Sequence, residues 1–405
     1  MNILVFCSNP VNGGTAKIFY ELVDSFSKNK RTNDKIFAAI NAKNPVEIYK
    51  KIEFLDRINA YSEDQVCEGM YGGKILFRII KRIFRKIKYF SVMKTNEKVM
   101  MEYLISHNID SVIVHNGGYV GDDVCNQMLH AAYKCRKNVR CRVFVMHSDF
   151  EKNRLSKIRF WGYDRKICRE ATELVTVSNY TRNRLLAQSY IDKDIKVIYN
   201  GLPEHNKLEK SEKEKKFNFR KGKKNILILG NFLKNKGQLQ FIETTRILND
   251  KRKDVNFFFV GNVYDEEYFA LCIEKINQYR LNNCVEVLHG INDAAEYMDL
   301  FDLIAIPSME DESFGLISVE AMSKAIPVVA FACGGIPEVI INGKDGFVVP
   351  IGDCEAMAEK IDVLLNDAKI SKQMGINGRK EYLEHFSLDV MSRKYYDLIE
   401  NYRRL

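Results

Sequence analysis

Short apolar runs alternate with helical stretches through both halves of this chain of 405 residues. Each run is rich in Val, Ile or Phe, and most runs end in Gly, Asn or Ser. This pattern predicts an α/β protein, in which buried parallel strands are joined by crossover helices. The predicted strands are 3–7, 35–40, 111–116, 142–148, 173–178 and 196–201 in the first half, and 225–231, 256–262, 285–290, 303–308, 327–331 and 346–350 in the second.

A highly charged stretch, 204–224, lies between the two halves and is almost free of aliphatic residues. We interpret it as a solvated linker and expect one domain over 1–205 and a second over 206–385. The length of the chain agrees, because two domains of roughly 200 residues are expected for it. Two doubly wound domains that face each other would bring the carboxyl ends of both sets of strands to one deep interdomain cleft, where ligands bind.

The composition, with 46% hydrophobic and 28% charged residues, is normal for a globular protein. No apolar run approaches the roughly 18–20 residues that span a bilayer. The ten cysteines lack the spacing of a metal site, and the run MNILVFCSNP lacks the basic start of an export signal. We therefore expect reduced thiols and a cytoplasmic protein. The net charge of +9 would suit nucleic acid, a membrane surface or an anionic substrate.

The segment 307–340 carries the strongest chemical signal. A strand ends at Ser308, an acidic turn follows, and a helix is predicted to begin near Ser313. Such a helix start attracts phosphate or hydroxyl oxygens, whereas carboxylates accept hydrogen bonds from hydroxyls. The carboxylates are those of Glu312 and Glu320, so the turn suits a sugar nucleotide, although a solvated acidic helix start would look the same. The N–H groups that would point out of the helix belong to Phe314, Gly315, Leu316 and Ile317.

The run E-S-F-G-L-I-S-V-E, followed by A-M, P-V-V-A and G-G-I-P-E, resembles the signature of the family-four retaining glycosyltransferases of the GT-B fold, the bacterial polysaccharide and glycolipid type. The resemblance covers nearly the whole chain. It implies two facing Rossmann-like domains, the first for the acceptor and the second for the nucleotide sugar, and a final helix over 386–405 that crosses back to the first. It also implies that Glu312 contacts the donor sugar, that Glu320 contacts the ribose, and that the backbone after Phe314 holds sugar and phosphate oxygens.

Three further segments match the family. In LGNFLKNKGQLQFI (229–242), Lys236 is placed to meet a diphosphate, but Asn231 stands where the family usually has an Arg, so this position brings no charge. Gly13 and Gly14 follow the first strand and lead into a helix with Thr15 as the expected N-cap, so the backbone could approach the diphosphate closely. Gly290 and Ile291, in VEVLHGIND, match the loop that holds the nucleobase.

His147 ends a predicted strand and is followed by a polar H-S-D turn. The family has a His at the corresponding strand end, near the donor sugar, so we expect His147 to position donor hydroxyls. His115, on the neighbouring strand, is a competing candidate.

These matches predict a retaining transferase that moves a sugar, of hexosyl type, from a UDP- or GDP-sugar to a saccharide or lipid-linked acceptor, with Glu312, His147 and Lys236 as its catalytic residues and no cofactor. Asp192 and Asp194 form a literal D-x-D, but they precede a strand in the first half, so we expect no metal. Lys236 and helix N–H groups would then stabilise the negative charge that develops on the diphosphate. The alternatives are an epimerase or phosphorylase of the same fold, and a non-catalytic sugar-nucleotide-binding protein.

Residues 74–90, KILFRIIKRIFRKIKYF, form a basic amphipathic pattern with an apolar stripe through Ile79, Ile83 and Ile87. The absence of any acid favours contact with an anionic membrane surface, so we expect a peripheral position on the inner face of the cell membrane. A core-packed helix with a solvated basic face is the alternative. Nucleic acid is not expected, because the basic residues lack interleaved base-stacking aromatics across a sheet.

Overall fold

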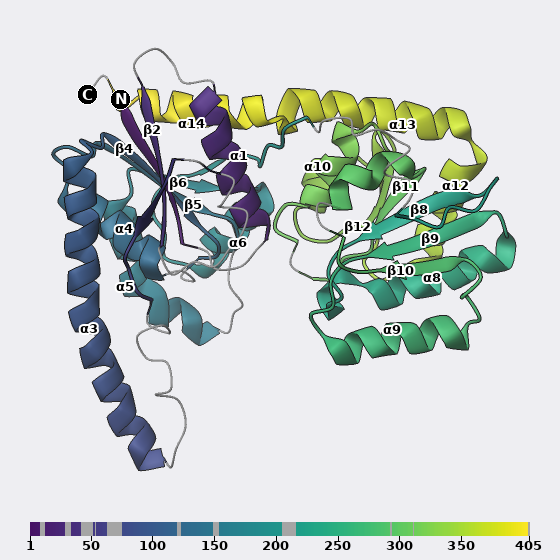
Figure 1. The fold of residues 1–405 in the computed structure, drawn as a ribbon, viewed down its shortest axis with the longest axis horizontal. Coiled ribbons are helices and arrows are strands. Elements are labelled where there is room, and N and C mark those ends of the chain that lie inside the picture. Colours follow the sequence, from purple (N-terminus) through teal and green to yellow (C-terminus); the bar gives the residue numbers. More distant parts are fainter. Residues whose placement is uncertain are drawn as a thin grey trace. The chain divides into compact units, whose positions relative to one another are not determined.

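The computed structural model describes residues 1–8, 13–28, 34–41, 52, 54–62, 75–119, 123–148, 154–204, 216–291, 294–310 and 312–403, and of 75–87 and 154–159 it describes the backbone only. The chain divides into two compact units, Met1–Asn200 with Met391–Leu405, and Gly201–Val390. Each unit is a parallel sheet with helices between most of the successive strands (Figure 1). Most of the predicted linker, 205–215, lies outside the described residues.

The first unit contains a seven-stranded sheet in the order β3-β2-β1-β4-β5-β6-β7. Neighbouring strands are parallel, and β1 meets β4 with Phe6 beside Val114. Every residue of β4 and β5 is buried, which explains the apolar runs 112–114 and 143–146 within these strands: helices cover both faces of the sheet. The strands are β1 (Asn2–Cys7), β2 (Lys35–Asn41), β3 (Leu55–Ile58), β4 (Ser111–Asn116), β5 (Cys141–Met146), β6 (Glu173–Thr176) and β7 (Ile195–Val197).

The helices of the first unit are α1 (Gly14–Lys28), α3 (Ile75–Ser106), α4 (Asp123–Lys134), α5 (Arg154–Glu170) and α6 (Asn179–Gln188). The helix predicted over 74–90 is longer in the structure, where α3 continues to Ser106, so the predicted end of this helix is corrected. Its second half supplies Met100 and Leu104 to the core of this unit. In Figure 1 the amino-terminal half of α3 projects past the sheet. The predicted apolar stripe lies outside the described side chains.

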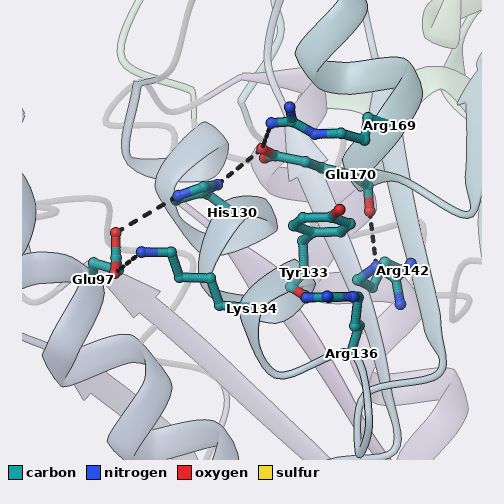
Figure 2. A network of polar contacts seen from close by, with 8 residues as sticks. All are labelled: Glu97, His130, Tyr133, Lys134, Arg136, Arg142, Arg169 and Glu170. Carbon is teal, nitrogen blue, oxygen red and sulfur yellow. Dashed lines mark hydrogen bonds and ion pairs between the residues drawn. The ribbon is translucent and has the colours of Figure 1, made fainter.

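A polar network joins α3, α4 and α5 (Figure 2). His130 on α4 lies between two carboxylates, with its Nδ1 2.9 Å from Glu170 Oε1 and its Nε2 3.6 Å from Glu97 Oε2. Lys134 donates to Glu97, and Arg169 donates to Glu170. Burial opposes ionisation of Glu170, but hydrogen bonds from His130 and Arg169 outweigh it and lower the pKa of this carboxyl. Because Glu170 ends the helix that precedes β6, the network lies at the amino edge of the sheet.

Arg142, near the start of β5, is 8% exposed and donates to backbone carbonyl groups that include those of Glu170 and Val139. Its guanidinium lies 5.8 Å from the ring of Tyr133, which Arg136 and Arg169 also approach, at 4.8 and 5.6 Å (Figure 2). Carbonyl groups at helix carboxyl ends favour a nearby cation. Arg142 therefore stabilises the carboxyl end of α5 and joins it to the loop between α4 and β5.

The second unit contains a six-stranded parallel sheet in the order β10-β9-β8-β11-β12-β13. Its strands are β8 (Lys224–Leu229), β9 (Val255–Val260), β10 (Val285–Leu288), β11 (Leu303–Ile306), β12 (Val328–Phe331) and β13 (Gly346–Val349). Its helices are α8 (Gln238–Lys251), α9 (Glu266–Gln278), α10 (Leu316–Ser323), α11 (Ile336–Val339), α12 (Cys354–Asn366) and α13 (Ala368–Glu381).

The last helix, α14 (Leu388–Glu400), begins in the second unit, and its residues from Met391 onward belong to the first. There it packs on α1, because the hydroxyl of Ser392 donates to that of Ser25 at 2.7 Å and the rings of Tyr396 and Phe26 lie 4.2 Å apart. Within the described residues, no helix is both long enough and apolar enough to cross a membrane.

Each predicted strand overlaps a strand of the structure, and among the described residues β3 is the strand that the pattern missed. Its sequence, LDRI, has two charged residues among four, because it is an edge strand with β2 as its only hydrogen-bonded neighbour in this sheet as described. An edge position does not demand a continuous apolar run.

Candidate functional site

Two loops at the carboxyl edge of the second sheet carry most of the predicted site residues. One follows β8 and includes the 3-10 turn η2 (Lys234–Lys236), and the other follows β11. They are joined by a hydrogen bond from the N–H of Met309 to the carbonyl of Asn235, 2.8 Å long. Gly237 closes the first loop with a left-handed φ of 70°, and a Cβ there would lie 1.8 Å from the carbonyl oxygen of Pro307. Glycine at this position therefore permits the two loops to approach.

Lys236 and Glu312 meet where these loops meet. Lys236 Nζ donates to Glu312 Oε2 at 2.7 Å, and the two side chains remain 28% and 21% exposed. The hydroxyl of Ser308 lies 3.4 Å from the same carboxylate oxygen. A partly solvated ion pair is worth about 1 kcal/mol or less, so an anionic ligand can compete for the ammonium group. The structure thus brings together two residues predicted from separate motifs.

The backbone that carries Glu312 is held by two glycines, Gly334 and Gly335. The N–H of Gly335 donates to the carbonyl of Glu312 at 2.7 Å. Gly334 has a φ of +58°, and a Cβ on it would lie 2.1 Å from that same carbonyl oxygen. Both glycines belong to the G-G-I-P-E run of the family signature, which by itself does not indicate their role. They position the Glu312 loop against the end of β12.

The helix predicted to begin near Ser313 begins at Leu316 instead, which corrects that boundary. Gly315 is its N-cap and has a φ of 93°, so the chain turns sharply before the first helical residue. Phe314 is buried, with its ring 5.9 Å from that of Phe386. The half-exposed residues at the helix start are therefore Leu316 and Ile317, whose N–H groups belong to the first turn. Glu320 lies inside α10 and is 6% exposed.

Two hydrogen bonds connect the loops at the ends of β8, β9 and β10, through Asn231, Asn262 and Gly290. The N–H of Asn262 donates to Asn231 Oδ1 at 3.3 Å, and the N–H of Gly290 donates to Asn262 Oδ1 at 3.1 Å. Asn231 therefore helps to order the loop that was predicted to hold the nucleobase. Because the N–H of Gly290 is already bonded, the neighbouring Ile291 is the freer backbone group for a base. Asn262 is the residue that sequence reasoning missed here, and only its position after β9 could have indicated it.

The remaining predicted site residues belong to the first unit. Gly13 and Gly14 are exposed, and a Cβ on Gly13 would meet no described atom within 4 Å. The helix begins at Gly14, so Thr15 is not its N-cap, and that expectation is corrected. The residues just before this pair, 9–12, lie outside the described part of the chain.

His147 follows β5 directly and contacts the competing candidate, His115 of β4. Nε2 of His147 lies 2.9 Å from Nδ1 of His115. His115 is fully buried and His147 is 7% exposed. Burial lowers the pKa of His147 to about 4. Burial, and then the proximity of His147, also lowers the pKa of His115. Both imidazoles are therefore neutral near pH 7, and the two candidates form one pair.

The D-x-D of Asp192 and Asp194 lies in the turn before β7, at the amino end of that strand, and both side chains are exposed. Glu381, Glu384 and His385 form a group within the described residues whose ligand atoms are close enough for one ion. Lys344 donates to Glu381 at 2.5 Å, so the ammonium group of Lys344 already pairs with one of these carboxylates. Neither set lies at the strand carboxyl ends that carry the candidate site.

Residues 62–205 match the family Glycosyltransferase Family 4, and residues 209–381 match the family Glycosyl transferases group 1. The chain is also 24% identical over 388 residues to a protein of Staphylococcus aureus named capsular polysaccharide biosynthesis glycosyltransferase CapM, across 89% of this chain and 95% of that one. The chain is a GT-B glycosyltransferase of the family-four type.

Solved structures agree with this glycosyltransferase fold. A glycosyltransferase from Rickettsia africae superposes with a TM-score of 0.77 at 20% identity, over 99% of this chain and 98% of that one. Anabaena HepE, solved in complex with UDP and glucose, superposes with a TM-score of 0.73 at 16% identity, over 99% of this chain and 100% of that one. The group 1 match contains Lys236, Glu312 and Glu320 of this glycosyltransferase, and the family 4 match contains His147.

Proposed function

We propose that this glycosyltransferase moves a hexosyl group from a nucleotide-diphosphate sugar to a saccharide or lipid-linked acceptor, with retention of anomeric configuration and without a metal. The observation that carries the proposal is the accessible Lys236–Glu312 pair beside the amino end of α10. A diphosphate would compete with Glu312 for the Lys236 ammonium group, and the freed carboxylate could then accept hydrogen bonds from sugar hydroxyls. The N–H groups of Leu316 and Ile317 would add to the positive potential at the diphosphate.

Several observations support the donor and the pathway. Anabaena HepE was solved with UDP-glucose as well as with UDP and glucose, and TarM of Staphylococcus aureus was solved with UDP and α-GlcNAc-glycerol. The name of the CapM relative refers to capsular polysaccharide biosynthesis. We extend a UDP- or GDP-sugar donor and cell-surface polysaccharide biosynthesis to this chain on that basis. Glu320 would contact the ribose, and Asn231 with Ile291 would lie beside the nucleotide.

We also propose that the amino-terminal half of α3 contacts the anionic inner face of the cell membrane. This segment contains seven basic residues and no acid between 74 and 90. Each basic residue near an anionic lipid surface contributes about 1 kcal/mol. The projection of this half-helix past its sheet supports the proposal, because a helix that covers the sheet along its whole length would have less free surface (Figure 1).

The test is a thermal-shift screen against UDP, GDP and ADP sugars, followed by donor hydrolysis. A true donor at a hundred times its dissociation constant should stabilise the protein by about 2.7 kcal/mol. An active transferase releases some sugar to water, whereas a protein that only binds the nucleotide releases none. NMR of the freshly released sugar, recorded before its anomers equilibrate, should show the anomeric configuration of the donor. Release of the opposite anomer would contradict retention.

A further inference from the structure

A single hydrogen bond joins the side chains of His115 and His147. Near pH 7 each neutral imidazole carries a single N–H, and the 2.9 Å contact between His115 Nδ1 and His147 Nε2 holds one of the two protons. Two arrangements satisfy this contact. In the first, His115 donates from Nδ1, and His147 carries its own proton on Nδ1. In the second, His147 donates from Nε2, and His115 carries its proton on its own Nε2.

The surroundings of His115 distinguish these arrangements. Its Nε2 is enclosed and has no hydrogen-bond partner in the described structure. The rings of Phe19 and Tyr395 flank this imidazole, with centroids 6.2 and 6.1 Å away. The second arrangement would leave an N–H at this apolar place without an acceptor. Buried N–H groups without an acceptor are rarer in proteins than buried acceptors without a donor, so the first arrangement is favoured.

We propose that His115 is a positioning residue: by donating its Nδ1 proton to Nε2 of His147, it holds His147 as the Nδ1–H tautomer. The backbone supports this geometry, because the N–H of His147 donates to the carbonyl of Asn116 at 3.2 Å and so fixes His147 beside the end of β4. Nδ1 of His147 has no hydrogen-bond partner among the residues that the structure describes, and its N–H is thus available at the carboxyl edge of the sheet.

The consequence is a defined chemical role. His147 presents a neutral hydrogen-bond donor, which binds a hydroxyl or phosphate oxygen, and it has no free lone pair with which to remove a proton from a ligand. His147 therefore acts on the ligand by orientation and His115 acts through His147. The identity of that ligand, a sugar nucleotide or its acceptor, rests on the proposed function, whereas the tautomer does not.

The first experiment measures the tautomer directly. Long-range ¹H–¹⁵N correlation spectra of the unliganded protein at pH 7, with His147 assigned by comparison with His147→Gln, should show a protonated Nδ1 and a bare Nε2. A protonated Nε2 on His147 would overturn the proposal. Because no substrate is present, this result does not depend on the proposed function.

The second experiment uses substitutions of His115. His115→Phe keeps an aromatic ring but removes the donor, so His147 should become a mixture of tautomers. Hydrolysis of UDP-glucose, or of the sugar nucleotide that the thermal-shift screen selects, should fall about tenfold, as expected when one neutral hydrogen bond to the ligand is lost. His115→Asn carries an amide N–H near the position of the imidazole Nδ1, so it should restore both the tautomer and the rate.

Phe19→Leu is the matched control, because it changes the packing against His115 and leaves the histidine pair intact. It should keep the Nδ1–H signal of His147 and the wild-type rate. If His115→Phe folds but leaves the tautomer and the rate unchanged, His115 has no positioning role. If His115→Phe does not fold, the spectra of the wild type and of His115→Asn still show which nitrogen of His147 carries the proton, and so they still test the proposal. A correct tautomer in a protein that hydrolyses no sugar nucleotide would contradict the proposed function alone.

Discussion

Lys236 and Glu312 form an ion pair of 2.7 Å across 76 residues of sequence, at the carboxyl edge of the second sheet. Each residue is carried by a loop whose path depends on glycines, Gly237 on one side and Gly334 with Gly335 on the other. The pair is therefore a product of two tight loops that approach each other, and it remains partly open to solvent.

We expect Lys236→Ala and Glu312→Gln each to reduce transfer by about a hundredfold or more, because each removes a charged contact to the donor. Unfolding free energy should change by less than about 1 kcal/mol, since the pair is partly exposed. Kinetics and thermal unfolding of both variants measure these effects. Lys224→Ala is the matched control. It removes the 2.9 Å Lys224–Asp302 ion pair at the start of β8, the strand whose other end leads into the Lys236 loop. Wild-type turnover in either site variant would show that the site is misassigned.

Gly334→Ala should lower transfer and stability more than Gly343→Ala does. Both glycines have a positive φ, +58° and +79°, so both substitutions carry a similar backbone cost of about 1–2 kcal/mol. A Cβ at Gly334 would also lie 2.1 Å from the Glu312 carbonyl oxygen, whereas a Cβ at Gly343 meets no described atom within 4 Å. Melting temperatures and donor hydrolysis of the two variants provide the comparison. Equal losses in both would mean that the Glu312 loop tolerates the displacement.

Activity should survive treatment with excess EDTA. The proposed charge stabilisation comes from Lys236 and the start of α10, whereas the D-x-D of the chain lies at the amino end of β7, in the other unit. Donor hydrolysis measured before and after chelation, with and without added manganese or magnesium, tests this directly. Loss of activity that either metal restores would refute the metal-free reaction.

Stability should fall as the pH decreases from about 6.5 towards 4, in part because of His147. Burial lowers its folded-state pKa from 6.5 to about 4, so between these values the unfolded chain binds a proton that the folded protein does not. Above pH 6.5 both states are neutral and the contribution vanishes. By pH 4 the loss from His147 alone is about 3 kcal/mol. Chemical unfolding of wild type and His147→Gln across this range should show a shallower decline in the variant, and parallel curves would contradict the assignment.

Replacing Arg78, Lys81, Arg82 and Arg85 with Ser should weaken binding to vesicles that contain anionic lipid. Transfer to a lipid acceptor should fall with it, but hydrolysis of the donor should change little because Lys236 and Glu312 belong to the other unit. Wild-type binding should weaken with added salt without vanishing, since burial of apolar residues adds to the charge effect. The control replaces four exposed lysines of the second unit by Ser, namely Lys251, Lys253, Lys369 and Lys372. Equal effects of the two sets, or wild type that ignores anionic vesicles at low salt, would reject the proposal.

The two sheets were predictable from the sequence because of how parallel strands are buried. A strand such as β9, VNFFFV, is buried at every position, so all but one of its residues are apolar and it is visible as a nearly continuous run. The edge strand β3 is under no such demand and was missed. Gly315 and Leu316 show the limit for helices: the acidic, serine-containing turn resembles a helix start, but a left-handed glycine delays the helix to Leu316.

The sequence by itself determined which elements carry the chemical groups, since Lys236, Glu312 and His147 each follow a recognisable strand. Only the tertiary structure decided which of these groups meet. Strand order places the loops after β8 and β11 side by side, and the same rule joins His115 to His147 and Asn231 to Asn262. The physical reason is that local side-chain patterns specify a strand or a helix, whereas contacts between distant residues depend on the order and register in which the strands pair. The left-handed glycines then determine how closely the loops approach, and that distance allows the ion pair to form.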